Sequence, residues 1–127
     1  MSSRSYRTLI LIPEADRLSW PELVTQLEAR LRTRVEAREY QASVHFGTCT
    51  FHLKCEDGPL VQMENTEILK GLQHPGGSFP TRLALHGPND VDLLCIDEFA
   101  LLLEALEALI PDAVVFDVLE RAWINAS

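Results

Sequence analysis

The stretch from Asn89 to Leu119 constrains the fold most, because it combines a leucine-dense helix pattern, a proline and a β-rich run. On a helical wheel its apolar residues fall in one broad arc and its acids on the far side. The arc consists of Val91, Cys95, Ile96, Phe99, Leu102, Leu103, Leu106, Leu109 and Ile110, and the far side carries Asp97, Glu104 and Glu107. This pattern predicts a long helix that lies on a core and ends before Pro111.

The start of this helix is predicted at Asn89, because asparagine is a favourable N-cap residue. Asp90 and Asp92 then lie in the first turn, where negative charge complements the positive end of the helix dipole. The run from Ala113 to Val118 has strand composition and follows after a short loop. We therefore expect the helix to pack on the sheet that contains this strand.

An earlier helix is predicted from a capping box and a hydrophobic staple. Ser19 is its N-cap, with Glu22 three residues later, while Leu18 and Leu23 occupy the two staple positions. The preceding run Tyr6–Ile12 is β-rich and ends in four consecutive apolar residues. A strand that is apolar on both faces is typical of the centre of a sheet.

Between the two helices the chain is β-rich and broken by turn signals. The first helix is expected to end near Thr33. Strands are expected over residues 34–40, over 43–54 as one long strand or a hairpin, over 60–63 after a turn at Asp57-Gly58, and over 81–86. A short helical patch is expected over Thr66–Leu72, followed by a surface loop at His74–Gly77.

The order of these elements predicts an α+β fold. Two helices separated by adjacent strands favour a mainly antiparallel sheet with both helices packed on one face, in a ferredoxin-like arrangement or a variant of it. At 127 residues the chain is expected to form a single domain that spans residues 1–127.

The net charge of −8 is unevenly distributed along the chain. Residues 1–54 contain eight Lys/Arg and six Asp/Glu, whereas residues 55–127 contain three and thirteen. Such an acidic half repels phosphate backbones and anionic lipid, so we expect neither a nucleic-acid nor a membrane partner, and a basic protein partner is favoured. The alternative is that the acids only keep the protein soluble.

The cysteines indicate a reduced protein. Cys49, Cys55 and Cys95 are odd in number and lack the spacing of a disulfide framework, so disulfides are not expected. No apolar run reaches the roughly 18 residues of a membrane-spanning helix. These features predict a cytoplasmic protein.

His45, Cys49, His52 and Cys55 are of metal-ligand type and lie close together in the sequence. On a single strand, His52 points away from the other three, and a four-residue offset spans about 13 Å. Zinc ligands must lie about 2.0–2.3 Å from one point. We therefore expect no metal site, no cofactor and no catalytic constellation. A small enzyme or ligand-binding domain with a site near His45, His52 and His86 is an alternative.

The carboxylates of the C-terminal part are the strongest candidates for a binding surface. Like charges on one helix face destabilise the helix unless something positive meets them. Exposed leucines among them are typical of an interface with an apolar centre and a charged rim. The predicted partner-binding residues are Asp90, Asp92, Asp97, Leu101, Glu104 and Glu107. A rival interpretation is that another element covers Leu94 and Leu101.

The Leu-Leu-Leu-Glu-Ala-Leu helix followed by Ala-Val-Val-Phe-Asp is similar to the end of several bacterial α+β families. In overall character the chain resembles the small acidic immunity proteins that bacteria encode beside secreted toxins. The resemblance covers about the last forty residues and implies inhibition by covering a basic active-site surface. It assigns no individual residue. A homo-oligomeric interaction domain, possible as a homodimer, is a further alternative.

Overall fold

The computed structural model describes residues 5–16, 19–89 and 94–124. The helices in these ranges are α1 (Trp20–Leu31), α2 (Pro59–Gly71) and α3 (Ile96–Leu109), with a 3₁₀ turn at Glu14–Asp16. The strands are β1 (Ser5–Ile12), β2 (Arg34–Ala37), β3 (Gln41–Phe46), β4 (Cys49–Asp57), β5 (Thr81–Asn89), β6 (Val114–Asp117) and β7 (Ala122–Trp123). No helix among these residues is long and apolar enough to cross a membrane.

All seven described strands form one antiparallel sheet in the order β2-β3-β4-β5-β1-β6-β7. Strand β1 lies inside the sheet, as its apolar run predicts: Ile10 is opposite Leu83 of β5 on one side and Val115 of β6 on the other. All three side chains are fully buried. The predicted α+β class and mainly antiparallel sheet are confirmed.

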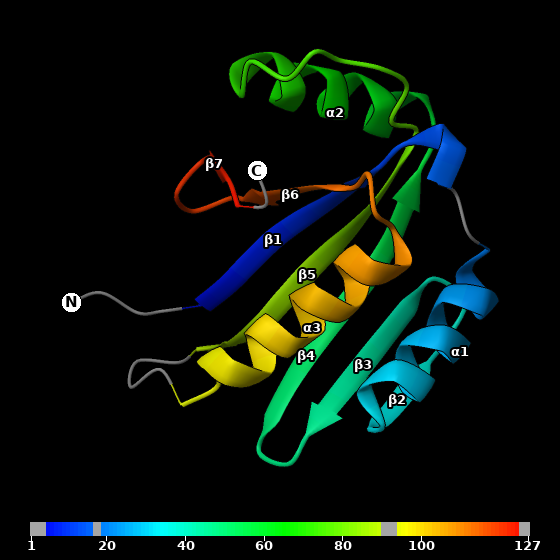
Figure 1. Ribbon diagram of the computed structural model, residues 1–127, viewed down its shortest axis with the longest axis vertical. Helices are drawn as coiled ribbons and strands as arrows, with labels where there is room; N and C mark the ends of the chain where they lie inside the picture. The colour runs from blue at the N-terminus through cyan, green and yellow to red at the C-terminus, as the bar shows by residue number, and fades with distance from the viewer. Residues whose placement is uncertain (1–4, 17–18, 90–93, 125–127) are drawn as a thin grey trace.

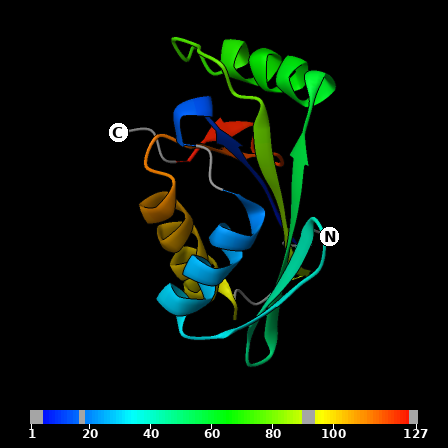
Figure 2. The ribbon, with the colours of Figure 1, turned by 90° about the vertical axis from the view of Figure 1, so that its right-hand side faces the viewer.

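The two faces of the sheet differ in what covers them. Helices α1 and α3 lie side by side on one face, here called the helix face, and enclose the main core (Figures 1 and 2). That core includes Ile10, Leu27, Leu83, Leu102 and Leu106. Helix α2 lies at one end of the molecule (Figure 2), and a smaller apolar cluster there joins it to the opposite, open face.

The finer topology prediction is not confirmed. The structure has a third helix, and its elements run β-α-β-β-β-α-β-α-β-β rather than the β-α-β-β-α-β of a ferredoxin-like fold. The sequence predicts a return strand and a short helical patch where the structure has the single helix α2, so the predicted order lacks one helix.

Helix α1 begins where its cap predicts. The Glu22 backbone N–H donates to Ser19 Oγ at 3.3 Å, and the Ser19 hydroxyl lies 3.2 Å from Glu22 Oε1. The helix ends at Leu31, two residues before the expected end, with Arg32 in the left-handed conformation as C-cap. Leu18, the other predicted staple residue, lies outside the described residues.

The predicted start of α3 is wrong. Asn89 is the last residue of β5 and is opposite Ser5, and the helix begins only at Ile96. Asn89 is held in β5 by its pairing with β1, so the tertiary partner overrides the local cap signal. Asp90, Val91 and Asp92 lie outside the described ranges. The predicted end is confirmed, because Ile110 is the C-cap before Pro111.

The middle of the chain departs most from the prediction. Residues 43–54 form a hairpin, with Gly47 in the left-handed conformation at the turn between β3 and β4. The predicted return strand over 60–63 is wrong, because these residues form the first turns of α2. Gly58 is the N-cap of that helix and Pro59 is its first residue, a position that favours proline. The predicted patch over Thr66–Leu72 is the second half of the same helix.

The prediction of reduced cysteines is also wrong for two of the three. Cys49 and Cys95 form a disulfide between the start of β4 and the N-cap position of α3. They are 46 residues apart in sequence, and only the folded topology brings their Cα atoms to 5.9 Å. Both are buried at the edge of the main core, while Cys55 is not part of the disulfide.

Candidate functional site

The outward side of α3 carries three of the predicted binding residues. Asp97, Leu101, Glu104 and Ala108 are spaced by four, three and four residues, so they form one exposed stripe along the helix, here called the α3 stripe. Leu101 is 51% exposed, and Leu94, just before the helix, is 77% exposed. No described residue covers either leucine, so the rival interpretation that an element hides them does not hold within this part of the chain.

The electrostatics of the α3 stripe are one-sided. Residues 94–120 contain seven carboxylates and no Lys, Arg or His. Within the described part of the chain, the salt bridges involve carboxylates of β2, β4 and α2 and none of α3. The α3 stripe therefore presents negative charge that no described cation neutralises.

The structure brings together three of the six predicted partner-binding residues and places a fourth beside them. Asp97, Leu101 and Glu104 lie on the α3 stripe, and Glu107 is half-buried on its flank. Asp90 and Asp92 lie outside the described residues, so the structure does not position them.

His45, His52 and His86 lie on the open face, because residues 43–54 form a hairpin rather than the single strand on which His45 and His52 would point apart. The β3–β4 hairpin places His45 and His52 on the same face, and turns Cys49 and Cys55 toward the helix face. His52 is opposite His86 of β5, and its Nδ1 lies 3.0 Å from Ser43 Oγ. Among the described residues no three metal-ligand side chains gather. The hollow beside His52 and His86 has a volume of about 100 Å³.

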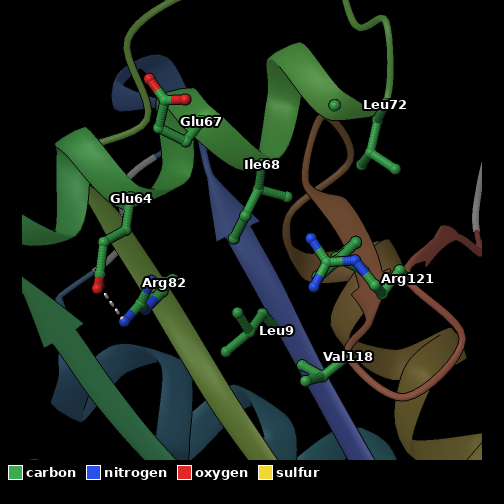
Figure 3. Close-up of a pocket in the computed structure, with 10 residues that line it drawn as sticks. Leu9, Glu64, Glu67, Ile68, Leu72, Arg82, Val118 and Arg121 are labelled. Carbon is green, nitrogen blue, oxygen red and sulfur yellow. Dashed lines mark hydrogen bonds and ion pairs between the residues drawn. The ribbon is translucent and has the colours of Figure 1, made fainter.

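A larger hollow, here called the α2 groove, lies between α2 and the open face (Figure 3). Its volume is about 630 Å³. Its lining residues are Leu9, Glu64, Glu67, Ile68, Gly71, Leu72, Arg82, Phe116, Val118 and Arg121. Sequence reasoning missed this groove because it assigned the first half of α2 to a strand. The signal that could have found it is the Gly58-Pro59 helix start.

A polar network fixes α2 at one end of the groove. The Arg82 guanidinium lies 2.8 Å from Glu56 Oε1 of β4 and 2.8 Å from Glu64 Oε1 of α2. Asn65 is fully buried, and its side-chain N–H donates to the Phe79 carbonyl at 2.8 Å. These polar contacts hold α2 beside β4 and β5, and Leu69 of α2 packs with Leu11 and Val114 of the sheet in the smaller apolar cluster.

Comparisons of the chain with family models, curated proteins and solved structures find no match. The fold is that of an α+β protein.

Proposed function

We propose that this chain is a binding protein that captures a basic protein partner through the α3 stripe. The observation that carries the proposal is the combination of exposed leucines with carboxylates that no described cation pairs. Leu94 and Leu101 supply an apolar centre, and Asp97 and Glu104 a charged rim. Single exposed leucines are common on protein surfaces. Leucines surrounded by carboxylates without cations are complementary to a partner that carries both apolar and cationic groups.

The geometry favours a foreign partner over a second copy of the chain. In a two-fold symmetric dimer the same patch meets itself, so the α3 carboxylates of one copy would face those of the other. Like charges in a desolvated interface repel strongly. A homodimer through this surface is therefore the less favourable alternative.

The geometry also favours this surface over a ligand site at the histidines. The hollow beside His52 and His86 is about 100 Å³, whereas small-molecule sites usually enclose about 300–1,000 Å³. His45 lies beside Glu36, with 3.4 Å between His45 Nε2 and Glu36 Oε1, and contributes nothing to that hollow.

In its specific form, the proposal is that the protein is an immunity protein. It would inhibit a cognate bacterial toxin by covering a basic active-site surface with the α3 stripe. The support is the resemblance of the last forty residues together with the acidic, exposed character of α3. We further propose a cytoplasmic location. In a reducing cytosol the Cys49–Cys95 disulfide would be reduced to two thiols.

The experiment is capture of the purified protein encoded by the neighbouring gene, measured by isothermal titration calorimetry. Reversing Asp97, Glu104 and Glu107 to Lys should weaken capture at least tenfold, on the order of the loss expected from several rim charge reversals. The matched control reverses Glu14, Glu39 and Glu120, which are exposed and lie off α3. This control changes the net charge by the same amount as the reversal on α3. Equal affinities for the two variants would refute the proposed surface.

A further inference from the structure

The α2 groove lies on the open face, away from the helix face that α3 covers, so it can act independently of the α3 stripe. Its floor is made by Leu9 of β1 together with Phe116 and Val118 at the end of β6. Its roof is the side of α2 that carries Ile68 and Leu72 (Figure 3). Ligand sites in proteins are concave and mostly apolar and usually enclose about 300–1,000 Å³. At about 630 Å³ the groove falls within this range.

The two arginines of the groove differ in what they contact. Arg82 is largely buried and already binds Glu56 and Glu64, so its charge is balanced. Arg121 is exposed, and no described carboxylate lies within ion-pair distance of it. Figure 3 shows the Arg121 side chain reaching into the groove, between Leu72 and Val118. The groove therefore has an apolar interior and one cationic group whose charge is not balanced locally.

We propose that the α2 groove binds a small amphipathic carboxylate. The apolar part of the ligand lies on Leu9, Ile68 and Phe116, and its carboxylate accepts hydrogen bonds from the Arg121 guanidinium. An arginine presents paired N–H donors that match a carboxylate, and such charge-assisted hydrogen bonds strengthen where water is partly excluded.

The lining residues also exclude other ligand classes. A small polar anion such as phosphate would leave the apolar floor of Leu9, Ile68 and Phe116 uncovered and would gain nothing from it. An uncharged hydrocarbon would cover the Arg121 guanidinium without pairing it, which costs free energy. A ligand with one carboxylate and an apolar body satisfies both constraints.

The test uses decanoate and 1-naphthylacetate as probes, with decanol as the uncharged analogue, measured by isothermal titration calorimetry. We expect at least one of the two acids to bind, and decanol to bind more weakly than decanoate. Arg121→Asn should weaken binding of the acid roughly ten- to hundredfold, the range expected for a lost charged hydrogen bond, and leave decanol binding unchanged. Asparagine tolerates the positive φ of 51° at this position.

Arg32→Asn is the matched control, because Arg32 is also an exposed arginine with a positive φ, 53°, but lies at the end of α1. It should bind the acid as the unmodified protein does. Val118→Trp should fill the groove and abolish binding, and its circular dichroism spectrum reports whether the fold is kept. Methyl chemical-shift changes at Ile68 and Leu72 should locate the bound acid.

Absence of binding of both acids at about 1 mM, a very weak affinity, would overturn the proposal, as would equal loss in the Arg32→Asn and Arg121→Asn variants. The proposal does not depend on the α3 stripe. Reversal of Asp97, Glu104 and Glu107 should leave acid binding unchanged, so failure of one proposal is distinguishable from failure of the other.

Discussion

Gly87 shows how one residue without a side chain determines the packing of a whole cluster. It lies in β5, and a Cβ atom at this position would lie 2.7 Å from Tyr6 Cδ2 and 2.8 Å from Phe51 Cε1. Tyr6, Phe51 and Phe99 pack together there, with ring centroids 4.4 Å apart for Tyr6 and Phe99 and 5.7 Å apart for Tyr6 and Phe51. The absent side chain leaves the space that the rings occupy.

Gly87→Ala should therefore destabilise the protein by about 1–3 kcal/mol, the usual cost of overpacking a core. The matched control is Gly71→Ala in α2, where a Cβ atom meets nothing within 4 Å. That change should stabilise the protein by about 0.5–1 kcal/mol through helix propensity. Urea denaturation measures both. A Gly87→Ala variant as stable as the unmodified protein would contradict the packing described here.

Asn65 is the residue on which the position of α2 depends. Its side-chain amide donates to the Phe79 carbonyl and accepts from Arg82 Nη1 at 3.4 Å, so Asn65→Ala leaves buried polar groups without these partners. The expected cost is about 1–3 kcal/mol, with faster amide hydrogen exchange across residues 59–71. Gln62→Ala, which removes only an exposed 3.4 Å contact with Ser78, should cost less than about 0.5 kcal/mol. Equal exchange rates in the two variants would show that Asn65 does not hold α2.

At the scale of elements, the disulfide joins the β3–β4 hairpin to the start of α3. A link between residues 46 positions apart restricts the unfolded chain. Its removal by Cys49→Ala with Cys95→Ala should destabilise the protein by about 2–4 kcal/mol. Hydrogen exchange should rise most at Ile96–Phe99, the first turn of α3. Cys55→Ala is the control and should lack the local effect. Failure to find a Cys49–Cys95 cross-linked peptide in the non-reduced protein would contradict the bond.

Elements with local signals were predictable, and elements defined by distant partners were not. The Ser19 cap and the Pro111 stop act within a few residues, so α1 starts and α3 ends as expected. Asn89 pairs with Ser5 of β1 and so belongs to β5 rather than to a helix cap, and α2 is anchored through Asn65 to the segment that leads into β5. Helical spacing alone placed Asp97, Leu101 and Glu104 together. The α2 groove and the disulfide join segments far apart in sequence, which spacing cannot predict.

At the scale of the whole molecule, the two sides of the sheet differ in how their carboxylates are paired. The α3 side carries Asp97, Glu104 and Glu107 with no described cation beside them, whereas Glu36, Glu56 and Glu64 on the other side lie within ion-pair distance of arginines. Unpaired charge on one side orients an approaching charged partner before contact. If the α3 stripe meets a basic partner, the field should act mainly on the rate of association and less on the rate of dissociation.

The salt dependence of the association rate with the neighbouring gene's product tests this claim most directly. For the unmodified protein the rate constant should fall on the order of tenfold between about 20 mM and about 300 mM salt, because ions screen steering. The variant with Lys at Asp97, Glu104 and Glu107 should associate slowly at every salt concentration. The control variant, with Lys at Glu14, Glu39 and Glu120, should keep most of the salt dependence. If both reversals slow association equally, or if the unmodified protein associates at the same rate at every salt concentration, the α3 stripe is not the surface that meets the partner.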